Sequence, residues 1–453
     1  MLEDLELFNE LVEILLNEEY TNPVARPIDT EHLFTSLDLQ LKAEPALDKE
    51  FKDTLTQVIK TTPKTASRSF FNQLFGGRMS RAVIGDLLAV MLNNSMYTYK
   101  VAGPQVGIEK VLLRAVCDLI GYPDSSDGTF APGGSMSNFM AALMARDKYN
   151  PDARTKGMTK PMTIYTSDVS HYSIGKNAAF LGIGKDQVRL IPSNEKGEML
   201  SNALEAQIIQ DKQNGMLPFF VNATAGTTVL GAFDDVTSIS AVCKSYNLWL
   251  HLDGAYCGAV IFSENYKHLV AGIEHTNSFS FNGHKMLGTP LGCSILVTQD
   301  KAHLYQSFSN DADYLYQTND DAFNLGKTSL QCGRRNDALK LWTLWKSVGH
   351  KGLKRIVEHQ FHLANVARSY VNEHSDYQLY SFDNSISVCF NYKGISARTL
   401  CTKLYEHSQL MVGYGSFRED TFVRLVTINT QVQEEDILAF FKTLESFVAS
   451  EKL

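Results

Sequence analysis

Cysteine is scarce in this 453-residue sequence and follows no metal-binding or disulfide spacing. The seven cysteines are scattered, odd in number and without a Cys-x-x-Cys pair. Neither a disulfide framework nor a zinc site is indicated by such a distribution, so the cysteines are interpreted as reduced thiols. We expect no metal site.

Long apolar runs and an excess of positive charge are also missing. No apolar segment approaches the roughly 20 residues that span a bilayer, and the acidic start Met1-Leu2-Glu3-Asp4 is unlike a signal peptide. The formal net charge of -8 leaves no basic stripe for a nucleic-acid backbone. The sequence therefore predicts a cytoplasmic globular protein whose partners include neither membranes nor nucleic acids.

The sequence does have the composition of a large folded protein, with 44% hydrophobic and 20% charged residues. Apolar residues recur at helical spacing from Leu5 to Leu15, which predicts a helical arm or dimer contact in residues 1–73. Residues 74–344 alternate short apolar runs with helical stretches, a pattern typical of a largely parallel sheet covered by helices. Residues 345–453 predict a smaller α+β domain.

Short apolar runs mark the expected strands of both sheets. In the large domain the runs are 162–165, 188–191, 219–222, 248–252, 278–281 and 294–297. In the small domain they are 386–390 and 422–426. Their length and their polar boundaries predict strands rather than helices.

A single lysine, Lys285, stands in the polar turn after the run 278–281. Lysine forms imines with aldehydes when a desolvated or cationic surrounding lowers its pKa, and the adjacent His284 fits that requirement. Taken alone, Lys285 is more typical of an ordinary solvated loop lysine. Other residues must decide between these interpretations.

Asp253 ends the strongly apolar run WLHLD. An acid at the end of such a strand belongs to a ligand crevice more often than to a core. Pyridoxal phosphate accepts electrons only while its pyridine nitrogen stays protonated, and a buried carboxylate keeps it so. Ala255 points to the same side and leaves room under a flat ring. The alternative is an aspartate that caps the next helix.

The run PGGSMSN, which ends at Asn138, opens a helical stretch and resembles a phosphate cradle. Free N–H groups and the helix dipole attract phosphate, Gly134 allows a close approach, and Ser135 and Ser137 add hydroxyl donors. Simple helix capping is the alternative.

Two further side chains could contact such a cofactor. His171 follows an expected strand and could stack on the pyridine ring, or be an ordinary loop histidine. Thr228 could donate a hydrogen bond to the phenolic oxygen, or pack as an ordinary β-branched residue.

Six blocks occur in order along nearly the whole chain: PGGSMSN, TSDVSHYSIGK, NATAGTTVLGAFD, WLHLDGAY, FNGHK and LQCGRR. Together they resemble the group II pyridoxal-phosphate decarboxylases. The runs FFNQL, NATAG and DYLYQ look most like the glutamate and cysteine-sulfinate branch. The resemblance implies fold type I, an aspartate aminotransferase-like α/β fold with a mostly parallel seven-stranded sheet. It also implies a homodimer whose active sites are shared between subunits.

The resemblance assigns roles to individual residues. It matches Lys285 to the lysine that carries the cofactor as an imine, Asp253 to the partner of the pyridine nitrogen, and His171 to the ring-stacking histidine. It matches Tyr314 to the tyrosine that returns a proton to Cα, and Arg424 to the arginine that grips the substrate α-carboxylate. The other expected cofactor-binding residues are Gly134, Ser135, Ser137, Asn138, Thr228, Ala255, Asn282 and His284.

The chain departs from the family pattern near the site. Relatives have DAAWGG where this chain has DGAYCG from Asp253, and WNPHK where it has FNGHK. Lys100 replaces an expected glutamate near the substrate pocket. Phe75 and Tyr97 are typical of the cysteine-sulfinate and aspartate branch, and a bulky Phe75 should shorten the pocket. Gln73 and Tyr97 are expected to contact the side-chain acid.

The sequence thus predicts pyridoxal-phosphate-dependent decarboxylation of cysteine sulfinate or aspartate, to hypotaurine or β-alanine. Glutamate, giving GABA, is the alternative, since one methylene is worth only about 1–3 kcal/mol of discrimination. Transamination or amine oxidation on the same fold and a catalytically silent scaffold also stay open. So does diaminobutyrate decarboxylation, in which Asp311 or Asp313 would face the cationic substrate.

Overall fold

The computed structural model describes residues 1–310, 314, 316 and 321–451, and the chain forms two compact units. One unit contains residues 78–361 and 382–385, and the other contains residues 1–77, 362–381 and 386–453. The first 77 residues therefore belong to the same unit as most of the C-terminal part. The division at residues 73 and 344 stays a prediction.

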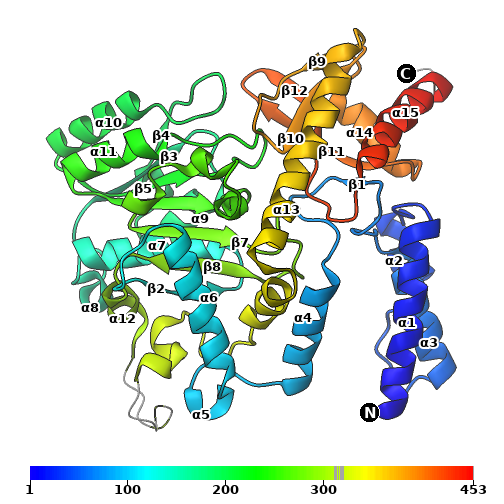
Figure 1. Cartoon of the computed structure of the whole chain (residues 1–453), viewed down its shortest axis with the longest axis horizontal. Helices are drawn as coiled ribbons and strands as arrows, with labels where there is room; N and C mark the ends of the chain where they lie inside the picture. The colour runs from blue at the N-terminus through cyan, green and yellow to red at the C-terminus, as the bar shows by residue number, and fades with distance from the viewer. Residues whose placement is uncertain (311–313, 315, 317–320, 452–453) are drawn as a thin grey trace. The chain divides into compact units, whose positions relative to one another are not determined.

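The larger unit contains a seven-stranded sheet in the order β2-β8-β7-β6-β5-β3-β4 (Figure 1). Its strands are β2 (Asp127–Ala131), β3 (Met162–Ser167), β4 (Val188–Ile191), β5 (Leu217–Thr224), β6 (Trp249–Gly254), β7 (Ser278–Asn282) and β8 (Ser294–Thr298). The strands from β3 to β7 pair in parallel, and β8 pairs antiparallel with both β7 and β2. The predicted mostly parallel seven-stranded sheet of an α/β fold is confirmed.

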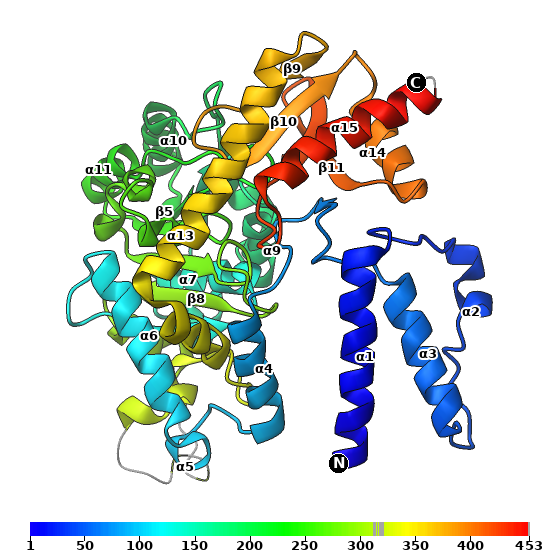
Figure 2. The same cartoon turned by 45° about the vertical axis from the view of Figure 1, so that its right-hand side comes forward.

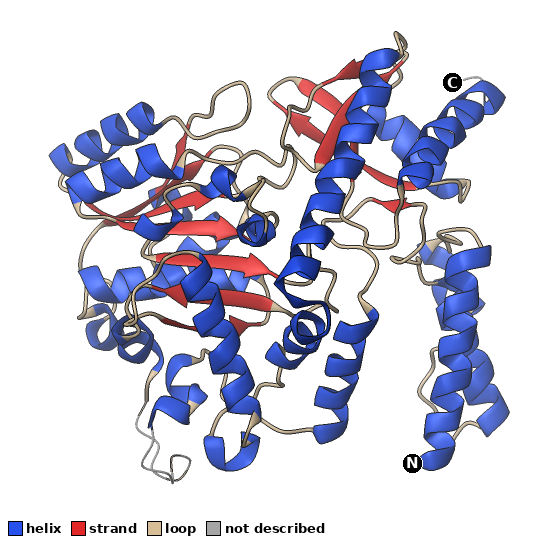
Figure 3. Ribbon diagram, viewed as in Figure 1, coloured by secondary structure: helices blue, strands red, loops and turns tan. Residues whose placement is uncertain are grey.

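Helices cover both faces of this sheet, which explains why its strands are apolar at successive positions (Figure 3). Ile164 of β3 packs in a core cluster with residues of helices α7 and α9. The next residue, Tyr165, donates a hydrogen bond to Asp211 of α10 over 2.8 Å. Successive strand side chains point to opposite faces, so α10 lies on the face opposite α7.

The helices of the larger unit connect these strands. They are α4 (Ser80–Leu92), α5 (Tyr99–Ala102), α6 (Gln105–Leu119), α7 (Gly134–Tyr149), α8 (Ala153–Lys156), α9 (Ser173–Phe180), α10 (Ser201–Gln213), α11 (Val236–Tyr246) and α12 (Ala302–Phe308). The long α13 (Ala338–Glu373) continues from this unit into the other and is broken at Gly349, where φ is 66°. Glycine adopts this left-handed conformation without the clash that a Cβ would cause.

The second unit contains a five-stranded sheet in the order β1-β11-β12-β10-β9. Its strands are β1 (Phe70–Phe71), β9 (Tyr377–Leu379), β10 (Ser387–Tyr392), β11 (Met411–Phe417) and β12 (Asp420–Val426). Besides the end of α13, its helices are α1 (Leu2–Thr21), α2 (Leu33–Ser36), α3 (Asp48–Thr61), α14 (Ala397–Glu406) and α15 (Glu434–Glu451). Its core joins Phe390 and Leu425 of the sheet to Leu400 of α14 and Phe440 of α15. The helices α1 and α3 lie side by side (Figure 2), with an ion pair between Lys52 and Glu10.

Among the described residues, no helix is both long enough and apolar enough to cross a bilayer.

Candidate active site

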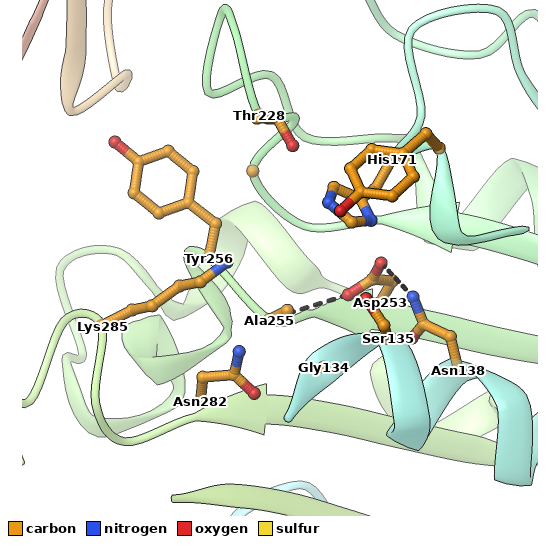
Figure 4. Close-up of a pocket in the computed structure, with 12 residues that line it drawn as sticks. Gly134, Ser135, Asn138, His171, Thr228, Asp253, Ala255, Tyr256, Asn282 and Lys285 are labelled. Carbon is orange, nitrogen blue, oxygen red and sulfur yellow. Dashed lines mark hydrogen bonds between the residues drawn. The ribbon is translucent and has the colours of Figure 1, made fainter. Parts of the chain in front are cut away.

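A cavity of about 150 Å³ lies in the larger unit at the carboxyl ends of the parallel strands β3, β5, β6 and β7 (Figure 4). The loops after these strands and the first turns of α7 supply its walls, because the carboxyl ends of parallel strands meet at one edge of a sheet. It is lined by Gly134, Ser135, Asn138, His171, Tyr172, Gly226, Thr228, Asp253, Ala255, Tyr256, Asn282 and Lys285.

Lys285 follows the end of β7, where its backbone N–H donates to the carbonyl of Asn282 over 3.1 Å. Burial lowers the pKa of the Lys285 amine, and the nearby charge of Asp253 opposes this effect only in part. The Tyr256 ring lies beside the amine, with its centroid 5.9 Å from Nζ. A lysine held in this way has a larger share of the neutral, nucleophilic form than a solvated lysine.

Asp253 is the penultimate residue of β6 and is only 4% exposed. Its Oδ2 accepts a hydrogen bond from Asn138 Nδ2 over 2.7 Å, and its Oδ1 accepts one from the backbone N–H of Ala255 over 3.0 Å (Figure 4). The two donors fix the plane of the carboxylate.

His171 lies on the opposite wall of the cavity from Lys285 (Figure 4). Its Nδ1 accepts a hydrogen bond from the backbone N–H of Ser173 over 3.2 Å, and burial lowers the pKa of its imidazole. The ring is therefore neutral near pH 7 with its proton on Nε2. Asn138 Nδ2 also lies 3.2 Å from Ser173 Oγ, so one amide connects the elements that carry Asp253 and His171.

The first turn of α7 and the end of β7 form the floor of the cavity. A Cβ at Gly134 would lie 2.9 Å from the Cβ of Ala255 and 3.1 Å from Asn282 Nδ2, so a larger side chain would intrude there. Asn282 Oδ1 is buried and accepts no hydrogen bond from the described residues. The glycine leaves room for an anionic ligand, and the helix N-terminus offers N–H donors to it.

Together these features fit pyridoxal phosphate. Lys285 supplies an amine for its aldehyde, Asp253 an acceptor for its pyridine N–H, and the start of α7 donors for its phosphate. Of the residues predicted to bind the cofactor, the following line the cavity: Gly134, Ser135, Asn138, His171, Thr228, Asp253, Ala255, Asn282 and Lys285.

Two residues predicted to bind the cofactor do not line the cavity. Ser137 is buried, and its Oγ lies 2.8 Å from Ser294 Oγ. His284 Nδ1 accepts a hydrogen bond from the backbone N–H of Cys293 over 3.1 Å, and burial lowers the pKa of His284 to about 4. His284 is therefore neutral near pH 7, and the expectation that it supplies a cationic surrounding for Lys285 is wrong. Burial lowers the Lys285 pKa instead.

The predicted substrate-binding residues lie outside the lining of this cavity. Tyr97 stacks on Tyr316, with ring centroids 5.5 Å apart, and Tyr314 is 78% exposed. Gln73, Phe75 and Arg424 belong to the other unit, in which Arg424 Nη2 donates a hydrogen bond to the backbone carbonyl of Asn72 over 2.9 Å. The roles assigned to these residues stay predictions.

The sequence analysis did not identify three residues that line the cavity, Tyr172, Gly226 and Tyr256. Two of them adjoin residues that it did identify, His171 and Ala255. Gly226 has φ of 89°, and a Cβ there would lie 2.4 Å from Cys257 Sγ. In the sequence, the run NATAG, which contains Gly226, is the feature that could have pointed to this residue.

Comparison with known proteins agrees with this site. Residues 30–393 match the pyridoxal-dependent decarboxylase conserved domain. The chain is 36% identical over 441 residues to cysteine sulfinic acid decarboxylase of Homo sapiens, covering 92% of this chain and 89% of the relative. It is 32% identical over 458 residues to an acidic amino acid decarboxylase of Xenopus tropicalis, covering 94% and 89%. A crystal structure of mouse CSAD superposes with a TM-score of 0.93 at 34% identity, covering 98% of each chain.

The fold and the cavity define a pyridoxal-phosphate-dependent enzyme of fold type I. This chain belongs to the pyridoxal-dependent decarboxylase family, and it is an amino acid decarboxylase.

Proposed function

We propose that the enzyme removes the α-carboxylate of a small acidic amino acid, cysteine sulfinate or aspartate, to form hypotaurine or β-alanine. The observation that carries the proposal is the cavity in which Lys285, Asp253 and His171 converge. The cysteine sulfinic acid decarboxylases and the acidic amino acid decarboxylase among its relatives support the choice of substrate class.

The chemistry divides between cofactor and protein. Bound pyridoxal phosphate supplies an electron sink for the bond that breaks. Lys285 offers an amine with a lowered pKa, Asp253 an oriented carboxylate for the pyridine N–H, and neutral His171 a flat ring against the cofactor. Arg424 would hold the substrate α-carboxylate out of the ring plane, and Tyr314 would return the proton to Cα.

Substrate choice is assigned to Gln73, Phe75 and Tyr97. A bulky Phe75 shortens the space for the side chain and favours an acid one methylene shorter than glutamate.

We also propose that the chain acts in the cytoplasm as a homodimer in which each active site draws residues from both subunits. Exposed apolar side chains on α4, among them Leu88 and Met91, support a partner surface there.

The alternatives differ in what they would produce. Glutamate would give GABA by the same steps, and transamination or amine oxidation would consume the amine instead of releasing carbon dioxide. Diaminobutyrate decarboxylation would depend on Asp311 or Asp313, which lie outside the described residues. A silent scaffold would bind the cofactor and turn nothing over.

The test is an end-point assay of the cofactor-loaded protein with cysteine sulfinate, aspartate and glutamate separately, following carbon dioxide and the amine. Faster turnover of the two shorter acids supports the proposal. Preference for glutamate would keep the reaction and reject the role of Phe75. No carbon dioxide from any of the three, with cofactor bound at Lys285, would reject decarboxylation of acidic amino acids.

A further inference from the structure

A chain of buried polar side chains extends from Asp253 into the interior of the larger unit. It consists of Asn138, His251, Ser278 and Trp249, of which the last three are 0% exposed. Buried polar groups are kept when their hydrogen bonds are satisfied, so the direction of each bond in the chain can be deduced.

At the Asp253 end of the chain, the carboxylate determines the direction of the first hydrogen bond. An ionised carboxylate only accepts hydrogen bonds, so the group 2.7 Å from Asp253 Oδ2 must be the Nδ2 of Asn138. The Oδ1 of Asn138 then lies 3.0 Å from His251 Nε2 and can only accept. His251 must therefore carry a proton on Nε2.

The other end of the chain is compatible with this tautomer. Trp249 Nε1 is only a donor, and it donates to Ser278 Oγ over 2.9 Å. Ser278 can then direct its own O–H toward His251 Nδ1, 2.9 Å away. Burial lowers the pKa of His251 to about 4, so the ring is neutral near pH 7 and Nδ1 accepts this bond. Every link from Trp249 to Asp253 donates in the same direction.

We propose that His251 is a positioning residue for the cofactor: its Nε2–H tautomer holds the Asn138 amide in the one orientation that donates to the Asp253 carboxylate. With the proton on Nδ1, Nε2 would need a donor. The Asn138 amide, 3.0 Å away, is closer to Nε2 than the Ser280 hydroxyl at 3.5 Å, so the amide would rotate to meet it. That rotation would place Asn138 Oδ1 against Asp253 Oδ2, and two acceptors at hydrogen-bond distance repel each other. The inference rests on the proposed contact between Asp253 and the pyridine nitrogen.

Two substitutions at His251 separate positioning from simple packing. In His251→Gln a side-chain amide can still donate to Asn138, whereas in His251→Leu the donor is lost. We expect His251→Leu to weaken pyridoxal-phosphate binding by about tenfold or more, the size of losing one hydrogen bond to a charged group, and to shift the absorbance of the bound cofactor. We expect His251→Gln to stay close to wild type in both measurements.

The matched control is Tyr122→Phe. Tyr122 is buried in the same unit, and its hydroxyl lies 2.6 Å from Thr276 Oγ1, away from the cavity. This variant should lower the unfolding midpoint and leave cofactor affinity and absorbance unchanged. The proposal is overturned if His251→Leu behaves like this control, or if His251→Gln is impaired as severely as His251→Leu.

A second measurement requires neither the His251→Leu variant nor the bound cofactor. Histidine ¹⁵N NMR of the wild-type apoprotein reports the tautomer of His251, with His251→Gln used to assign its signal. A proton on Nε2 supports the proposal, and a proton on Nδ1 or a doubly protonated ring at pH 7 overturns it. If the tautomer is as expected but wild type neither binds pyridoxal phosphate nor decarboxylates, the proposed function fails instead.

Discussion

Lys285 becomes reactive through its surroundings. A solvated lysine is almost entirely protonated near pH 7, and only the neutral amine attacks a carbonyl. At Lys285 burial lowers the amine pKa, while the adjacent His284 is neutral and contributes no positive charge at that pH. Desolvation by the packed loops at the strand ends therefore lowers the Lys285 pKa more than the neighbouring His284 does.

Replacing Lys285 tests this residue directly. Lys285→Ala should lower turnover by at least about a hundredfold, because no other side chain of the cavity offers an amine. Borohydride reduction followed by mass spectrometry should attach the cofactor to wild type and not to the variant. The exposed Lys244→Ala is the control and should behave as wild type; an active Lys285→Ala enzyme would contradict the assignment.

Gly134 tests the floor of the cavity. In Gly134→Ala the new Cβ would lie 2.9 Å from the Cβ of Ala255, so the floor must shift and cofactor affinity should fall by about tenfold. Titration of the apoprotein with pyridoxal phosphate measures this loss. A Cβ at Gly107, on α6, would have no atom within 4 Å, so Gly107→Ala should bind the cofactor normally. Equal affinity of the two variants would argue against a tight floor.

At the scale of elements, buried charges connect α6 to the segment that precedes α13. Arg334 donates to Glu109 through both terminal nitrogens, over 2.8 and 2.6 Å, with the side chains 4% and 1% exposed. Glu109→Ala leaves a buried guanidinium unpaired and should cost about 3–5 kcal/mol of stability in denaturant unfolding. As a control, Asp152→Ala removes the exposed ion pair between Asp152 and Lys156 and should cost less than about 1 kcal/mol of stability. Similar losses of stability in Glu109→Ala and Asp152→Ala would mean that Arg334 finds another partner when Glu109 is removed.

The break in α13 depends on one backbone conformation. Gly349 has φ of 66°, and a Cβ there would meet no atom within 4 Å, so only the backbone opposes a side chain. Gly349→Ala should lower stability by about 1–3 kcal/mol, and Gly349→Asn by a similar amount, because φ of 66° with ψ of 177° is a conformation that essentially only glycine adopts. The midpoints of denaturant unfolding measure the loss of stability in both variants. Gly333→Ala, equally open and without a positive φ, is the control; equal stability of all three would exclude backbone strain at residue 349.

At the scale of the whole molecule, buried neutral histidines make stability depend on pH. Burial lowers the pKa of both His251 and His284 to about 4, below the unfolded value near 6.5. Between about pH 4 and 6.5 the unfolded chain binds more protons than the folded one, so stability rises with pH across this window, by roughly 1.4 kcal/mol per unit for each group. Below pH 4 this contribution is lost.

His284→Gln should flatten that dependence, because glutamine does not titrate. Comparison of unfolding midpoints at pH 5 and pH 7 should show a smaller difference in His284→Gln than in wild type. His275→Gln, at an exposed position, should keep the wild-type difference. An unchanged pH dependence in His284→Gln would show that other groups cause it.

The sequence by itself determined the class of fold and pointed to the candidate reactive residues. Six apolar runs correspond to strands β3 to β8, because strands buried on both faces must be apolar at successive positions. The seventh strand, β2, was missed because its sequence DGTFA is short and only weakly apolar. Lys285 and Asp253 could be found because their chemistry is unusual at the ends of apolar strands.

Only the tertiary structure decided which polar groups face the cavity. Ser135 lines it, whereas Ser137 bonds Ser294, because residues two apart on a helix point to nearly opposite sides. The chain from Trp249 to Asp253 joins β6, β7 and α7, and its order depends on the register of the sheet, in which His251 pairs with Ser278. No spacing along the sequence encodes that register, since it arises from packing residues that are far apart in the chain.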